Sequence, residues 1–168
     1  VALLEKGNVS NTMGDLDKAM DLYENCIKHL EKVNNLSQIA RAYNNMGDVC
    51  LQKESWSKAM EYFERSRASA RHVGGRYMIA WSLFNEAEAL ANLNKPDEAI
   101  EKLKESHDIL KALGDRMGML AVHKNFAIAH GLKGDWKASE ENFRKSLDMA
   151  TELNIPDVKA EIHLHWGI

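Results

Sequence analysis

Residues 43–50 read YNNMGDVC and residues 56–66 read WSKAMEYFERS, and these two stretches carry the clearest structural signal in the chain. In the second stretch, Ala59, Phe63 and Ser66 follow one another at steps of four and three residues. That spacing is typical of one face of an α-helix. The first stretch shows the same steps. The pair therefore predicts two amphipathic helices joined by a short turn.

The pattern returns every 40 residues along the 168-residue chain, with no insertion or deletion. Where two helices cross closely, a side chain larger than methyl would push their axes apart, so small residues must recur at the crossing points. The small columns are Gly7, Gly47, Ala87, Ala127 and Gly167, and then Ala19, Ala59, Ala99 and Ser139; the bulky column is Tyr23, Phe63, Leu103 and Phe143. A fixed period of this kind predicts a stack of helical hairpins.

The chain reversals give a second signal at the same period. Residues that tolerate a left-handed backbone end the second helix of each hairpin, at Asn34, Gly74, Gly114 and Asn154. The turn inside each hairpin carries Gly14, Glu54, Asn94 and Gly134. The column after it holds Asp15, Ser55, Lys95 and Asp135, of which the three with a side-chain oxygen are predicted to cap the next helix. We expect helices at about 1–13, 15–33, 36–53, 55–73, 76–93, 96–113, 116–133, 135–153 and 157–168.

These columns resemble the tetratricopeptide repeat family, in the 40-residue long-helix branch that is similar to Pins-type adaptors, kinesin light chains and Rap-type regulators. The resemblance covers all 168 residues, although Lys6 and Glu86 stand where an apolar residue is usual. It implies an all-α fold, a right-handed α-α superhelix of about nine helices. The expected organisation is one solenoid domain over 1–168, a fragment of a longer protein, with repeats at about 1–35, 36–75, 76–115 and 116–155 and a partial one at 156–168.

The resemblance also implies that the first helices line a concave groove that holds peptides or protein segments. Helix geometry, at about 100° per residue, places a second stripe opposite the apolar stripe of each first helix. Its members are Arg41, Asn45, Asp48 and Gln52, then Trp81, Asn85, Glu88 and Asn92, then Ala121, Asn125, Ile128 and Leu132. Flanking positions add Asn44, Phe84 and Lys124.

Asn45, Asn85 and Asn125 share one column of this stripe, and His165 continues it. An asparagine amide offers a donor and an acceptor, as each residue of a peptide backbone does. The column is therefore predicted to hold an extended ligand by its main chain. The alternative interpretation is that these amides are merely tolerated in solvent or bond the adjacent repeat.

The other stripe residues predict a groove of mixed charge. Trp81 and Phe84 are expected to be exposed on this face, where they would anchor a ligand. The alternative is that they pack against the neighbouring first helix. Arg41 and Lys124 suit a ligand carboxylate, whereas Asp48 and Glu88 suit a basic ligand residue.

Several function classes are disfavoured. The net charge is −3 with no basic helix face, which disfavours nucleic acid. No apolar run is long enough to span a membrane. Cys26 and Cys50, spaced 24 apart in helical patterns, indicate a reducing compartment, and we expect a cytoplasmic protein. No phosphate loop or metal motif occurs, His123 faces the core, and we expect no catalytic residues, no metal, no cofactor and no enzyme activity.

The leading hypothesis is a protein- or peptide-binding scaffold. The alternative is a ligand-sensing regulatory segment of a larger multidomain signalling or transcription protein. An RNA-reading helical array is a third hypothesis, which the negative net charge disfavours. We also expect a weak homo-oligomer through the open solenoid ends, where the last half-hairpin exposes its apolar face.

Overall fold

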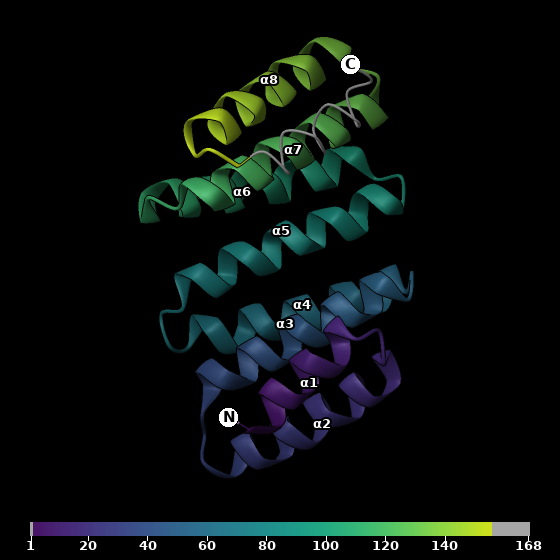
Figure 1. The fold of residues 1–168 in the computed structure, drawn as a ribbon, viewed down its shortest axis with the longest axis vertical. Coiled ribbons are helices and arrows are strands. Elements are labelled where there is room, and N and C mark those ends of the chain that lie inside the picture. The colour runs from purple at the N-terminus through teal and green to yellow at the C-terminus, as the bar shows by residue number, and fades with distance from the viewer. Residues whose placement is uncertain (1, 156–168) are drawn as a thin grey trace. The chain divides into compact units, whose positions relative to one another are not determined.

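The structure is a computed structural model that describes residues 2–155, which form eight helices and no strand (Figure 1). The helices are α1 (Ala2–Thr12), α2 (Leu16–Lys32), α3 (Leu36–Gln52), α4 (Trp56–Arg71), α5 (Arg76–Asn92), α6 (Pro96–Leu113), α7 (Arg116–Lys133) and α8 (Trp136–Glu152). Their ends agree with the sequence prediction within two residues, the largest difference being the end of α4. The ninth helix expected at 157–168 lies outside the described residues.

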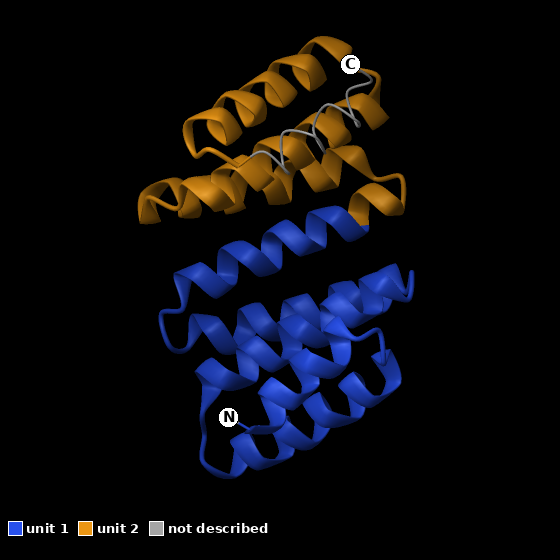
Figure 2. Ribbon diagram, viewed as in Figure 1, with its two compact units in different colours: residues 1–89 blue, residues 90–168 orange. Residues whose placement is uncertain are grey.

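The chain divides into two compact units, with the boundary inside α5 after Ala89 (Figure 2). In unit 1, α1 packs against α2, α2 against α3, and α3 against α4. In unit 2, α6 packs against α7 and α7 against α8. Each unit is therefore built from helices that contact their neighbours along the chain, as stacked hairpins require.

The small and bulky columns meet in the core of unit 1. A methyl group on Gly7 would lie 2.4 Å from the Tyr23 ring, and one on Gly47 would lie 2.3 Å from the Phe63 ring. Both rings are fully buried. Glycine is required here because the ring of the second helix lies directly over the backbone of the first. The packing reason inferred from the sequence is confirmed at these two crossings.

The predicted left-handed residues at the ends of the second helices are confirmed. Gly74 and Gly114 have φ values of 64° and 70°, and Asn34 and Asn154 have 50° and 55°. Inside the hairpins, Glu54 also adopts a positive φ, of 54°. A glutamate tolerates this backbone poorly, so the turn geometry of the hairpin outweighs the local preference of the residue.

The capping prediction is wrong for Asp15 and Ser55, whose side chains make no cap hydrogen bond. The carboxylate of Asp15 lies 3.9 Å from the Lys18 ammonium instead, and the Ser55 hydroxyl donates to the Lys53 carbonyl at 3.4 Å. Local partners compete with the backbone for short polar side chains. Two caps outside this column are Asn35, which accepts from the Gln38 N–H at 3.2 Å, and Asp115, which accepts from the Gly118 N–H at 2.9 Å.

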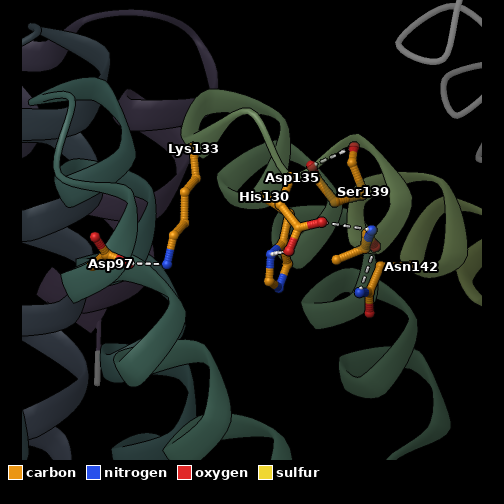
Figure 3. A network of polar contacts seen from close by, with 8 residues as sticks. Asp97, His130, Lys133, Asp135, Ser139 and Asn142 are labelled. Carbon is orange, nitrogen blue, oxygen red and sulfur yellow. Dashed lines mark hydrogen bonds and ion pairs between the residues drawn. The ribbon is translucent and has the colours of Figure 1, made fainter.

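Asp135 does cap its helix, α8, and organises the turn before it (Figure 3). Its carboxylate accepts from the Ala138 N–H at 3.2 Å and lies 3.6 Å from Nδ1 of His130. At the end of α7, the Lys133 ammonium donates to Asp97 of α6 at 2.5 Å. The turn between α7 and α8 is thus bonded both to α6 and to the first turn of α8.

Ties between repeats recur at nearly constant sequence separation within each unit. Lys53 pairs with Asp17, and Lys133 pairs with Asp97, across 36 residues in both cases. The ammonium of Lys53 lowers the pKa of the Asp17 carboxyl. Nε2 of Gln52 also donates to Oδ1 of the Asn11 side chain, at 2.9 Å and 41 residues away. Successive hairpins are therefore held at the register of the sequence period.

A buried ion pair explains the charged residue at position 86. Glu86 and Arg67 of α4 pair with each other, and the two residues are only 5% and 6% exposed. Each charge would be costly to bury alone, and pairing offsets that cost. The sequence departure at Glu86 is therefore matched by a partner on the preceding helix.

Candidate peptide-binding site

The predicted stripes of α3 and α5 face a common hollow of about 460 Å³ in unit 1, here called the α3–α5 pocket. It is lined by Asn44, Asp48, Leu51, Gln52, Tyr77, Met78, Trp81, Asn85 and Glu88. A volume of this order is typical of a site that takes a small ligand or a few side chains of a peptide.

Six of the residues predicted from the sequence line this pocket; they are Asn44, Asp48, Gln52, Trp81, Asn85 and Glu88. Leu51, Tyr77 and Met78 also line the pocket and were not predicted from the sequence. Tyr77 stands four residues before Trp81, on the same face of α5. Extending the Trp81 stripe by one turn toward the start of α5 would have found it.

Asp48 is the electrostatic centre of the pocket. Its Oδ1 accepts from Nδ2 of Asn85 at 2.8 Å, and its Oδ2 accepts from Nδ2 of Asn44 at 3.4 Å. Burial and, to a smaller extent, the negative charge of Glu88 raise the pKa of the Asp48 carboxyl to about 7. The carboxyl can therefore take up or release a proton near neutral pH, and its charged form favours a cationic partner.

A chain of hydrogen bonds through two buried serine hydroxyls fixes the side chain of Asn44. Oγ of Ser82 lies 3.2 Å from Oδ1 of Asn44 and 2.9 Å from Oγ of Ser66. Ser66 in turn donates to the Ala40 carbonyl at 2.8 Å. This chain joins α3, α4 and α5, so the amide that faces Asp48 has a fixed orientation.

Aromatic rings form another wall of the pocket. The rings of Tyr77 and Trp81 have centroids 6.1 Å apart, and Trp81 meets Phe84 edge to face at 5.3 Å. The expectation of exposed rings needs correction, because Trp81 and Phe84 are both partly buried and pack on each other along α5. Phe84 is also absent from the pocket lining. Tyr77 is the open aromatic, at 54% exposed.

The indole nitrogen of Trp81 is buried and has no hydrogen-bond partner within residues 2–155. A buried N–H without a partner costs free energy in the folded protein. An acceptor group on a ligand would relieve that cost.

The asparagine column bonds neighbouring first helices in unit 1. Nδ2 of Asn45 donates to Oδ1 of Asn8 at 2.7 Å, and Nδ2 of Asn85 donates to Asp48. Both bonds reach back 37 residues to the preceding repeat. The second interpretation of this column, bonding of the adjacent repeat, is therefore what the structure shows for these two amides. Each such bond uses one of the two N–H hydrogens that an amide offers.

The remaining predicted residues are not gathered at the pocket. Arg41 lines a second hollow beside it. Asn92, Lys124 and Asn125 belong to unit 2. His165 lies outside the described residues.

Burial shifts the pKa of three nucleophilic or basic side chains, Cys26, Cys50 and His123, toward the neutral form. Cys26 and Cys50 are free and buried, and burial raises the pKa of both thiols, which disfavours the reactive thiolate. Burial lowers the pKa of His123, whose Nδ1 lies 2.9 Å from Oδ1 of Asn142. His123 is partly buried and has this partner, so the inward-facing position expected from the sequence is confirmed.

Within residues 2–155, no three His, Cys, Asp or Glu side chains come together as a metal site would require. In the same part of the chain, no helix combines the length and apolar character needed to cross a membrane.

The chain is similar to known proteins in sequence and in fold. The tetratricopeptide repeat profile matches residues 1–72 and 76–152. A Tonsoku-like protein from Danio rerio is 27% identical over 146 residues, which make up 86% of this chain and 9% of that protein. The crystal structure of BtubC (BKLC) from P. vanneervenii superposes with a TM-score of 0.81 at 16% identity, over 91% of this chain and 63% of that chain.

Two Rap structures are similar to the same extent. A Rap protein in complex with Competence and Sporulation Factor has a TM-score of 0.82 at 16% identity, over 98% of this chain and 48% of that chain. Apo RapI has a TM-score of 0.82 at 15% identity, over 98% of this chain and 63% of that chain.

At such identities the structural likeness shows the fold alone. It confirms the fold class expected from the sequence, all-α and of the α-α superhelix type. The chain spans 9% of the Danio rerio relative and about half to two thirds of the solved chains. Since the repeat profile covers nearly all of the sequence, this chain belongs to the tetratricopeptide repeat family.

Proposed function

We propose that this chain is a protein-interaction scaffold that binds an extended peptide or protein segment in the α3–α5 pocket. The observation that carries the proposal is the convergence of six predicted contact residues on one hollow of about 460 Å³. Aromatic walls supply contact area, while amides and a carboxylate supply direction, which is the usual make-up of a recognition site.

The fold and the chemistry of the chain support binding over catalysis. A Rap protein of the same fold was solved with Competence and Sporulation Factor bound, so the fold accommodates a bound partner. The thiols of Cys26 and Cys50 are buried, and burial raises the pKa of both, which disfavours the reactive thiolate. These free thiols also support a reducing, cytoplasmic setting for the scaffold.

The proposed contacts are those of unit 1. They include the six pocket residues together with Arg41, Asn45 and Phe84 on the same two helices. Asn92, Lys124, Asn125 and His165 stay predictions from the sequence.

A display library of random peptides about 12 residues long, enough to cross several helices when extended, tests the proposal. We expect the protein to enrich a defined set of peptides. Gln52→Trp should abolish that enrichment, because Gln52 is exposed and lines the pocket, so the larger side chain fills the hollow without disturbing the core.

Trp81→Ala should weaken binding of the same peptides about tenfold or more. Trp136→Ala is the matched control, because Trp136 is 72% exposed at the start of α8 and lies outside the pocket lining. Circular dichroism of each variant checks the fold. If no peptide is enriched, or if Gln52→Trp leaves the enriched set unchanged, the pocket is not the binding site.

A further inference from the structure

A second hollow adjoins the α3–α5 pocket and differs from it in chemistry. It has a volume of about 230 Å³ and is lined by Ser37, Ala40, Arg41, Ala70, Val73, Gly75, Tyr77 and Met78. We call it the apolar hollow, since alanine, valine, methionine and tyrosine carbon make up most of its wall. An apolar cavity of about 150 Å³ already accepts a benzene molecule, so this space admits one large apolar side chain.

Tyr77 and Met78 line both hollows. The two spaces therefore share a wall at the start of α5. An extended peptide that lies along α3 and α5 would pass from one to the other, and its neighbouring side chains would enter different chemical environments.

The larger space favours a cation. Asp48 is partly buried there with Glu88 as its charged neighbour, and its two bonded side chains, Asn44 and Asn85, are neutral amides. A lysine or arginine head group would neutralise this carboxylate and would contact the aromatic faces of Tyr77 and Trp81 on the same wall. A ligand carbonyl would at the same time give the buried Trp81 N–H its missing acceptor.

We propose that the two hollows form one bipartite site for an extended peptide, with a lysine or arginine at Asp48 and a large apolar side chain in the apolar hollow. The inference rests on the proposed function and names the ligand chemistry of that same site. Charge complementarity fixes the first position, and the lining of the smaller space fixes the second.

The experiment begins with the peptides enriched from the display library. We expect a lysine or arginine and, a few positions away, a leucine, isoleucine, methionine or phenylalanine. Replacing the basic residue by norleucine or citrulline, which keep its length without its charge, should weaken binding about tenfold, as expected for a cation paired with a partly buried carboxylate.

Asp48→Asn supplies the second arm of a double-mutant cycle. The variant should weaken binding of the cationic peptide about tenfold and leave the uncharged analogue nearly unaffected, because the coupling belongs to the charge pair. The amide keeps an oxygen that can accept from Asn85, so the fold should be retained.

Ser37→Phe tests the apolar hollow, because Ser37 is exposed and lines that space. It should remove the preference for the apolar residue while the basic residue is still selected. Ser57→Phe on the exposed face of α4 is the matched control and should change neither preference.

The outcomes separate the two proposals. If peptides bind but show no basic residue, or if Asp48→Asn does not discriminate the cationic peptide from its analogue, the bipartite site is refuted and the scaffold proposal stands. If no peptide is enriched at all, both are refuted.

Discussion

Asp48 is held by groups that favour opposite charge states. The N–H donors of Asn85 and Asn44 favour the carboxylate, whereas burial and the charge of Glu88 favour the neutral acid. The net result is a pKa raised from 3.8 to about 7. Near neutral pH the charged form therefore makes the folded state less stable, which is common at positions selected for binding.

We expect Asp48→Asn to stabilise the folded protein, relative to the wild type, increasingly as the pH rises. The raised pKa means that the folded protein binds this proton more tightly than the unfolded chain does. The protonated Asp48 carboxyl makes its whole contribution to the free energy of unfolding below about pH 4, and this contribution is lost as the pH rises toward 7. Asparagine does not titrate, so the variant loses nothing over this range. The free energy of unfolding of the variant should gain about 1–3 kcal/mol on the wild type between about pH 4.5 and pH 8.

Urea unfolding of both proteins at the two pH values measures this gain. If the difference in unfolding free energy between the two proteins does not change with pH, the charge of Asp48 does not destabilise the fold. If the variant is less stable than the wild type at both pH values, the hydrogen bonds of the carboxylate outweigh the cost of its charge.

At the scale of helices, the crossing of α3 and α4 depends on Gly47. A methyl group there would lie 2.3 Å from the buried Phe63 ring. We expect Gly47→Ala to lower the free energy of unfolding by about 1–3 kcal/mol, because the ring has no room to move. Gly131→Ala in α7 is the control, since a methyl group there would find its nearest neighbour at an ordinary 3.5 Å.

The sequence itself offers a rescue. In the same two columns the third repeat carries Ala87 and Leu103 instead of glycine and an aromatic residue. Adding Phe63→Leu to Gly47→Ala should therefore recover a good part of the lost stability, as measured by chemical unfolding. If the losses of unfolding free energy caused by Gly47→Ala and by Phe63→Leu simply add, the two positions are not coupled.

The helices were predictable because their signals are local. The bounds of α6 and α7 match the expected ranges, since proline, glycine and apolar spacing mark their ends within a few residues. The failed caps at Asp15 and Ser55 show the limit of this reasoning. A side-chain oxygen chooses among several nearby partners, and that choice depends on rotamers rather than on residue type.

The site was only partly predictable because its contacts cross repeats. Helix periodicity placed Asp48, Asn85 and Glu88 on facing stripes, and the pocket does bring them together. Periodicity did not reveal that Asn45 would be bonded to Asn8, 37 residues earlier. Such pairings depend on the distance between helices, which residue spacing within one helix does not encode.

At the scale of the whole molecule, weak self-association stays a prediction. The C-terminal half-hairpin on which it was based lies outside the described residues. In the N-terminal hairpin, the apolar side chains of Val9 in α1 and Met13 in the turn after it are 59% and 79% exposed and line a hollow of about 620 Å³. This face is where a second copy would dock.

We expect the double variant Val9→Lys, Met13→Lys to shift the self-association midpoint to higher protein concentration, since charged side chains oppose burial of that face. Light scattering over a concentration series gives the midpoint. Leu113→Lys, at a residue 43% exposed at the end of α6, is the control. A wild type that stays monomeric at high concentration would contradict the prediction.

The lysine–aspartate ties across 36 residues have a consequence for how such a chain can evolve. Both partners recur after 80 residues, which is two periods, while Ser57 and Leu93 occupy the same columns in between. A duplicated or deleted segment of 80 residues can therefore leave each lysine facing an aspartate. Insertions of other lengths would break the correspondence. Gain and loss of repeats in pairs is therefore the mutational route by which this architecture can lengthen or shorten without having to acquire new lysine–aspartate contacts.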